Sequence, residues 1–213
     1  MRKYIVCVGE CMMELQFHNM QNMDLAYGGD VYNTAFAIKQ CDLSDSKVSF
    51  LSALGDDEFS QQMLEAWQQQ GIDTEQVSIS AGGLPGLYMV KTDATGERSF
   101  NYWRNESAAR DLFQSSGLPP ILKTLAVPSC LYFSGISLAI MNIANRKCLL
   151  HYAKSWAESG CVVIFDPNFR KQLWPSIEEA RHWIDAAWEV SDIGLPTLVD
   201  EQLLFGIDSA EES

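Results

Sequence analysis

The sequence predicts an α/β fold in which helices cover both faces of a mainly parallel sheet and a small second sheet is attached. The first observation is the run of residues 161–165, Cys-Val-Val-Ile-Phe, which is apolar throughout and follows a helical pattern. Such a run is typical of a strand that is buried on both faces of a parallel sheet. The second is the alternation of helix and strand patterns from about residue 130 onward. The third is a hairpin pattern in residues 86–104.

The first half of the chain supplies strands on either side of a helix. Apolar or alternating patterns predict strands over residues 3–8, 12–17 and 48–54. Between the last two, Asp30 is predicted to cap the N-terminus of a helix over residues 31–40, because a short acidic side chain there can accept a free backbone N–H.

A further helix follows the strand at residues 48–54. Asp56 and Asp57 open it, and Gly71 is a natural end, since glycine readily adopts the left-handed conformation found after helices. Its predicted apolar face carries Phe59, Met63, Leu64 and Trp67.

Residues 86–92 and 97–104 are two strand-like runs around a turn that contains Gly96. If Asp93 pairs with Glu97, Tyr88 lies opposite Tyr102, and Tyr102 shares a face with Arg104 because side chains alternate along a strand. One face then presents two phenols and a guanidinium. An ordinary hairpin with aromatic cross-strand contacts accounts for these residue types at least as well.

The second half of the chain reads as β-α-β. The predicted elements are a strand at 131–133, a helix at 142–158, the strand at 161–165, a helix at 176–189, a short strand at 192–195 and a helix from about Leu198. Residues 208–213 look like the start of one more helix. The sheet is therefore expected to be incomplete.

Composition excludes several classes of protein. The 213 residues are 47% hydrophobic and 20% charged, an ordinary globular balance, and no apolar run approaches the ~20 residues that cross a bilayer. A net charge of −13 argues against a nucleic-acid partner, because a phosphate backbone requires a basic face. The six cysteines form no CxxC pair and only three histidines are present, which indicates reduced structural cysteines in a cytoplasmic protein and no metal site built from them.

Three groups of residues are candidates for ligand binding, because open α/β sheets bind ligands at strand ends and turns. The first is residues 28–35, where two glycines precede a helix N-terminus and Asn33 offers a donor and an acceptor. The second is the hairpin face with Tyr88, Tyr102 and Arg104. The third is residues 166–170, Asp-Pro-Asn-Phe-Arg, just after a buried strand. Taken singly, each also has an ordinary explanation: a tight turn, an aromatic hairpin and a surface salt bridge.

Together these segments resemble the ribokinase-like (PfkB) carbohydrate kinases. Gly28, Gly29, Asn33 and Ala35 are similar to the family's GGxxxNxA signature, and Asp166, Asn168 and Arg170 to its DxNxR element. Gly55 and Asp57 are similar to a GxDxxG-like segment in which Ser60 replaces the last glycine. Residues 86–88, 95–98, 102–104, 134–136, 173–174, 195–197, 200–201 and 204–206 most resemble the members that act on 2-keto-3-deoxygluconate.

The resemblance implies a ribokinase-like α/β fold, with residues 1–213 as one incomplete domain and a β-sheet lid built from about 12–18 and 86–104. It implies a kinase that transfers the γ-phosphate of ATP, with Mg²⁺, to the C6 hydroxyl of 2-keto-3-deoxygluconate. It places Gly29, Asn33, Tyr88, Tyr102, Arg104, Ile136 and Arg170 around the sugar, and Asn168 and Asp200 on the magnesium–phosphate side. Glu14 lies where family members hold a sugar hydroxyl. The implied partners are this small keto-sugar acid and a second copy of the chain joined through the lid.

The charge of the implied substrate agrees with the arginines. A guanidinium fork matches a carboxylate in bidentate geometry, and 2-keto-3-deoxygluconate carries a carboxylate whereas fructose and ribose do not. Arg104 and Arg170 are therefore the expected partners of the acid group.

One element of the family is absent. The family's DTxGAGD motif carries the catalytic base and a phosphate-binding turn, and no Gly-Ala-Gly-Asp occurs in this sequence. The base is expected beyond Ser213, and the chain alone is expected to be inactive, because phosphoryl transfer depends on such positioning and charge stabilisation. Two alternatives stay open: a kinase of the same fold for fructose, ribose or a nucleoside, and a non-catalytic sugar-acid-binding fragment. A Rossmann oxidoreductase is less favoured, since residues 8–13 lack GxGxxG.

Overall fold

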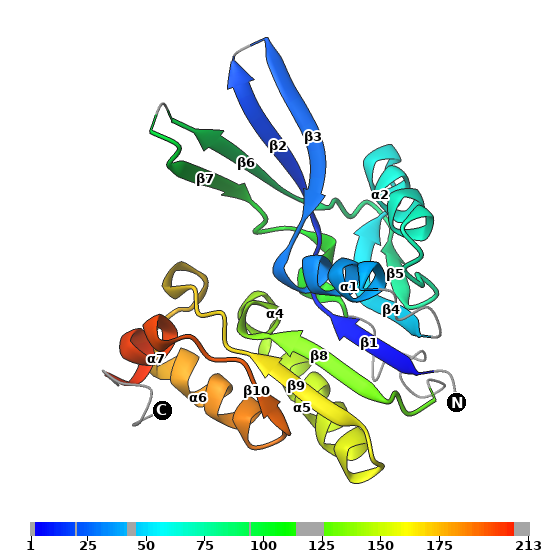
Figure 1. Ribbon diagram of the computed structural model, residues 1–213, viewed down its shortest axis with the longest axis vertical. Helices are drawn as coiled ribbons and strands as arrows, with labels where there is room; N and C mark the ends of the chain where they lie inside the picture. Colours follow the sequence, from blue (N-terminus) through cyan, green and yellow to red (C-terminus); the bar gives the residue numbers. More distant parts are fainter. Residues whose placement is uncertain (1–2, 20, 42–45, 94, 114–125, 207–213) are drawn as a thin grey trace.

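The computed structural model describes residues 3–19, 21–41, 46–93, 95–113 and 126–206, and the predicted fold class is confirmed (Figure 1). A six-stranded sheet, parallel at every pairing, has the order β10-β9-β8-β1-β4-β5. Its strands are β1 (Tyr4–Val8), β4 (Lys47–Gly55), β5 (Val77–Ser80), β8 (Cys130–Ser134), β9 (Val162–Asp166) and β10 (Ile193–Gly194).

Helices cover both faces of this sheet, because successive residues of each strand point to opposite sides. Ile5 and Cys7 of β1 face the side covered by α1 (Asp30–Gln40) and α2 (Glu58–Gln69). Val6 and Val8 face the side where α5 (Ile143–Glu158), α6 (Ile177–Trp188) and α7 (Leu198–Phe205) pack. The central strands β1, β4 and β8 are therefore buried almost throughout, whereas the edge strands β5 and β10 are partly exposed.

A second sheet of four strands projects from this layered body at the upper part of Figure 1. Its order is β3 (Asn22–Gly28), β2 (Met12–Asn19), β6 (Gly86–Thr92) and β7 (Arg98–Trp103). The predicted hairpin register is confirmed, with Tyr88 opposite Tyr102 and the Asp93 N–H donating to the Glu97 carbonyl at 2.9 Å. Two strands were not predicted: β3, which pairs antiparallel with β2, and β5, which pairs parallel with β4.

Two local predictions were wrong. Asp30 does not cap α1: it is the first residue of the helix, Gly29 occupies the cap position, and none of the described side chains caps this N-terminus. The Asp30 carboxylate instead accepts a hydrogen bond from the Asn168 side chain at 3.1 Å. Phe59 is 51% exposed and does not join the buried face of α2, because Ser60 turns inward in the first turn of that helix.

Ser60 accounts for the missing glycine of the GxDxxG-like segment. Its buried hydroxyl accepts the Gly55 N–H at 2.9 Å and donates to the Asp57 carboxylate. Asp57 caps α2 by accepting the N–H groups of Phe59 and Ser60. Partial burial acts to raise the pKa of Asp57, but these hydrogen bonds outweigh it and hold the pKa below its ordinary value.

Three short helical elements were not predicted: α4 (Gly135–Ile140) and the 3-10 turns at Ala108–Asp111 and Lys171–Leu173. The predicted helix start at residues 208–213 lies outside the described residues. None of the helices in the described ranges is both long and apolar enough to span a membrane.

Candidate functional site

A cavity of about 230 Å³ lies where the carboxyl ends of the parallel strands meet the small sheet. Its lining consists of Glu10, Met12, Gly29, Asp30, Asn33, Tyr88, Phe100, Tyr102, Arg104, Ile136, Asn168 and Arg170. All seven residues predicted around a sugar are among them, as is Asn168. The structure therefore brings together segments that are up to 160 residues apart, at the edge where α/β sheets bind ligands.

The N-terminus of α1 contributes the glycine corner of the cavity. A Cβ on Gly29 would lie 2.3 Å from the Glu10 carbonyl oxygen, so any larger residue would push the two backbones apart. Gly29, Asp30 and Asn33, at the cap position and in the first turn of α1, line the cavity, and no side chain of the described residues caps this helix. A helix N-terminus of this kind favours polar or anionic ligands.

The turn after β9 presents Asn168 and Arg170 to the same cavity. The Asp166 carboxylate accepts the Asn168 N–H at 3.0 Å, and Asn168 adopts the left-handed conformation at φ 35°, which asparagine tolerates better than most residues. Burial raises the pKa of Asp166, and the nearby charges of Asp30 and Asp200 act in the same direction. The turn reverses the chain so that Arg170 lines the cavity.

Arg170 is exposed, and its guanidinium donates to the Phe169 carbonyl at 2.9 Å. Within the described ranges no carboxylate forms an ion pair with it. Its positive charge is therefore available to an anion that enters the cavity.

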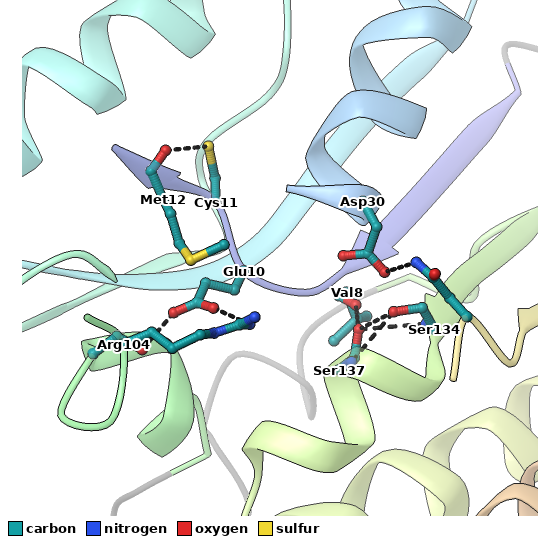
Figure 2. A network of polar contacts seen from close by, with 10 residues as sticks. Val8, Glu10, Cys11, Met12, Asp30, Arg104, Ser134 and Ser137 are labelled. Atoms are coloured by element: carbon teal, nitrogen blue, oxygen red, sulfur yellow. Dashed lines mark hydrogen bonds and ion pairs between the residues drawn. The ribbon is translucent and has the colours of Figure 1, made fainter. Parts of the chain in front are cut away.

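The start of α4 fixes Ile136 at the cavity. Ser134 and Ser137 form a reciprocal capping box, and the Ser137 hydroxyl also donates to the Val8 carbonyl of β1 at 2.8 Å (Figure 2). A Cβ on Gly135 would lie 2.0 Å from the Pro167 carbonyl oxygen, so this helix and the turn after β9 are in close contact.

Aromatic rings from the small sheet form the opposite wall. The rings of Tyr88 and Tyr102 stack with centroids 5.7 Å apart, and Phe100 stacks against Tyr102 at 6.3 Å. The Tyr88 hydroxyl donates to Glu14, and burial together with this carboxylate raises the tyrosine pKa. Glu14 itself does not line the cavity but a neighbouring hollow of the small sheet.

The sequence analysis missed Glu10, which lines the cavity and is buried at its base. Its carboxylate accepts hydrogen bonds from the Arg104 guanidinium and the Ser107 hydroxyl, and Figure 2 shows Glu10 and Arg104 facing each other. Burial raises the pKa of Glu10, although Arg104 and Ser107 oppose that shift. An acidic residue directly after a buried first strand was the only available signal.

Asp200 was predicted on the magnesium–phosphate side. It lies in the first turn of α7, is buried, and accompanies the Thr197 cap, whose hydroxyl accepts the Asp200 N–H at 3.1 Å. It does not line the cavity but lies near enough to Asp166 to influence its pKa.

Comparison with known proteins identifies the class to which this arrangement belongs. The crystal structure of the 2-dehydro-3-deoxygluconokinase of Thermotoga maritima has the same fold, with a TM-score of 0.82 at 21% identity over 99% of this chain and 66% of that one. Residues 2–213 match the model of the pfkB family of carbohydrate kinases. The chain therefore belongs to the pfkB family of carbohydrate kinases.

Curated relatives differ in how similar they are. The 2-dehydro-3-deoxygluconokinase of Escherichia coli strain K12 is 42% identical over 213 residues, which are all of this chain and 69% of that protein. Fructokinase-1 of Oryza sativa subsp. japonica is 34% identical over 187 residues, 88% of this chain and 55% of that protein. The sequence thus stands nearer to the first of these two relatives.

Proposed function

We propose that this chain holds the sugar site of a kinase that transfers the γ-phosphate of ATP to the C6 hydroxyl of 2-keto-3-deoxygluconate, the compound also called 2-dehydro-3-deoxygluconate. The single observation that carries the proposal is the cavity with Arg170 on its wall, a guanidinium that has no acidic partner among the described residues. A keto-sugar acid has a carboxylate for that guanidinium and hydroxyls for Asn33, Tyr102 and the backbone at Gly29. The 42% identity to a relative with this name supports the same substrate.

The residues present fit a magnesium–nucleotide on one side of the cavity. Magnesium is usually held by one or two carboxylates together with phosphate oxygens. Asn168 of the cavity lining, and Asp200, which lies outside the lining but close enough to Asp166 to affect its pKa, would supply oxygen atoms there. Among the described residues no group of three acidic, histidine or cysteine side chains could hold a metal by itself, so phosphate oxygens would complete the coordination. When bound, the ion would neutralise charge on the transferring phosphate.

Turnover is not expected from these 213 residues alone. The sequence contains no Gly-Ala-Gly-Asp segment, and the family resemblance assigns removal of the hydroxyl proton to the aspartate of that motif. We therefore expect the chain to bind the sugar without turning it over.

The direct test measures both properties. The purified chain is mixed with magnesium-ATP, with and without 2-keto-3-deoxygluconate, and ADP is followed; we expect no sugar-dependent ADP. The chain is then titrated calorimetrically with the keto-acid, and we expect saturable binding. Sugar-dependent turnover would show that another residue acts as the base, and absence of binding would contradict the proposed sugar site.

Two alternatives remain, each with its own observation. A kinase for fructose, ribose or a nucleoside is favoured by the 34% identity to a fructokinase, and it predicts tighter binding of the neutral sugar than of the keto-acid. A non-catalytic sugar-acid-binding protein is favoured by the missing motif, and it predicts that a longer form of the protein is also inactive.

We also propose that the outer face of the small sheet binds a second copy of the chain. The register places Leu15 and Leu25 opposite each other on the face that points away from Tyr88, and Met23 and Trp103 lie on that same face. Met23 is 41%, Leu25 46% and Trp103 56% exposed, an apolar surface of the kind that marks protein interfaces.

Leu25→Lys is therefore expected to convert a dimer into a monomer, because a lysine would be buried without a partner. Sedimentation equilibrium measures the mass. Gln69→Lys adds the same charge on the exposed side of α2 and should leave the dimer intact. A monomeric unchanged chain would contradict the proposed interface.

A further inference from the structure

A buried ion pair forms part of the cavity wall. The side chains of Glu10 and Arg104 are only 2% and 7% exposed, and Arg104 donates through Nη2 to one carboxylate oxygen while Ser107 donates to the other. Arg104 therefore already has a full counter-charge next to it before any ligand enters. Its Nε, buried as well, has no hydrogen-bond partner in the part of the chain that the structure describes.

The charges that line the cavity cancel. Of the described residues that line the cavity, Glu10 and Asp30 are acidic and Arg104 and Arg170 are basic, so their formal sum is zero. Within the described part of the chain, the Asp30 carboxylate bonds to the neutral Asn168 amide and Arg170 forms no ion pair, whereas Glu10 and Arg104 neutralise each other directly. Loss of Arg104 would thus uncover a buried negative charge at the ligand.

The backbone is shaped around Glu10. A Cβ on Gly86, where β6 begins, would lie 2.9 Å from a Glu10 carboxylate oxygen and 3.3 Å from the Arg104 Cβ. Gly29 contacts the Glu10 carbonyl from the other side. Both glycines leave room for the acid at the junction of the two sheets.

We infer that Glu10 is a specificity-determining residue: it positions Arg104 and cancels its charge, so that Arg170 supplies the attraction for an anionic sugar. The inference rests on the proposed function only for the identity of the ligand. The alternative is that Arg104 itself binds the sugar carboxylate. In that case, removing Glu10 could not restore the affinity for the acid that is lost when Arg104 is removed.

A double-mutant cycle separates the two roles. Glu10→Gln, Arg104→Gln and the double variant are titrated at pH 8 with 2-keto-3-deoxygluconate and with its methyl ester, which has the same skeleton without the charge. Relative to the ester, the acid should bind about tenfold tighter to Glu10→Gln and about tenfold weaker to Arg104→Gln. In the double variant, the ratio of the affinity for the acid to that for the ester should return to within about threefold of the ratio in the unchanged chain.

A double variant that stays about tenfold weaker for the acid, relative to the ester, would overturn the inference. Urea unfolding checks that each variant folds. If a single variant does not fold, the double variant decides alone, because it replaces the ion pair by two neutral amides. An unchanged ratio of the affinities for acid and ester supports the inference, and a selective loss of affinity for the acid overturns it.

The result also distinguishes this inference from the proposed function. If the unchanged chain binds the ester and not the acid, the proposed substrate is wrong. Even then, the inference about Glu10 predicts that Glu10→Gln gains affinity for the acid. If it does not, the inference is wrong.

Discussion

Arg170→Gln is expected to weaken the binding of 2-keto-3-deoxygluconate about 30-fold and that of its methyl ester less than about threefold. Arg170 lines the cavity and pairs with no carboxylate in the ranges that the structure describes, so its charge is free to act on the ligand. A hydrogen bond to a charged group contributes about 2 kcal/mol, which corresponds to the 30-fold change. Isothermal titration with the two ligands measures the ratio.

The neighbouring residue provides a matched control. Lys171 is also an exposed cation on the same turn but does not line the cavity, so Lys171→Gln removes an equal charge without removing a ligand contact. It should change the affinity for either ligand by less than about threefold, because surface charges are screened. Equal losses of acid and ester in Arg170→Gln would mean that Arg170 does not face the carboxylate.

The prediction for Arg170 could be made from sequence, because the turn that carries it is local. Asp166 and Asn168 are two residues apart, and an acid followed by an asparagine after a buried strand commonly forms such a turn. The hairpin register could be predicted for the same reason, since alternation and Gly96 fix it within 19 residues.

The prediction for Glu10 could not be made in this way. Glu10 and Arg104 are 94 residues apart, and their contact depends on how the small sheet joins the parallel one. In the sequence Glu10 only interrupts an apolar run, and Arg104 only ends a strand. An ion pair between two distant elements does not change the hydrophobic periodicity of either one, so the sequence pattern does not reveal it.

The strand β3 was missed although a signal existed. Met23, Leu25 and Tyr27 alternate with more polar residues, which is the pattern of a strand with one apolar face. The apolar side chains of this edge strand are largely exposed, however, so the pattern is not tied to burial in the core. The proposed dimer would explain this exposure, because a second copy of the chain would cover the apolar face.

The largest expected loss of stability comes from Arg146, a buried cation on α5. Its Nε donates to the Leu138 carbonyl at 2.8 Å and another nitrogen to the Glu179 carboxylate of α6. The guanidinium also lies over the rings of Trp174, at 5.0 Å from the centroid, and Trp183, at 5.3 Å. One planar cation thus joins the end of α4, the turn after β9 and α6.

Arg146→Met is expected to lower the free energy of unfolding by about 3 kcal/mol. Methionine keeps apolar contact with the two tryptophans but removes the guanidinium donors to the Leu138 and Ala139 carbonyls, of which the first keeps only the Met141 N–H among the described residues. It also leaves the partly buried Glu179 carboxylate without its arginine, and a partly buried charge that loses its partner is costly. Arg146→Lys keeps the positive charge but not the planar guanidinium, and it should lower the free energy of unfolding by about half as much. Urea unfolding with a shared m-value measures both.

Lys147→Met controls for the removal of a positive charge from the same helix. Lys147 is exposed, so its change should stay within about 0.5 kcal/mol. A loss below about 1 kcal/mol for Arg146→Met would contradict the bridging role. Because α4 also fixes Ile136 at the cavity, a loss of about 3 kcal/mol with weaker keto-acid binding would show that Arg146 couples the stability of this helix to the site.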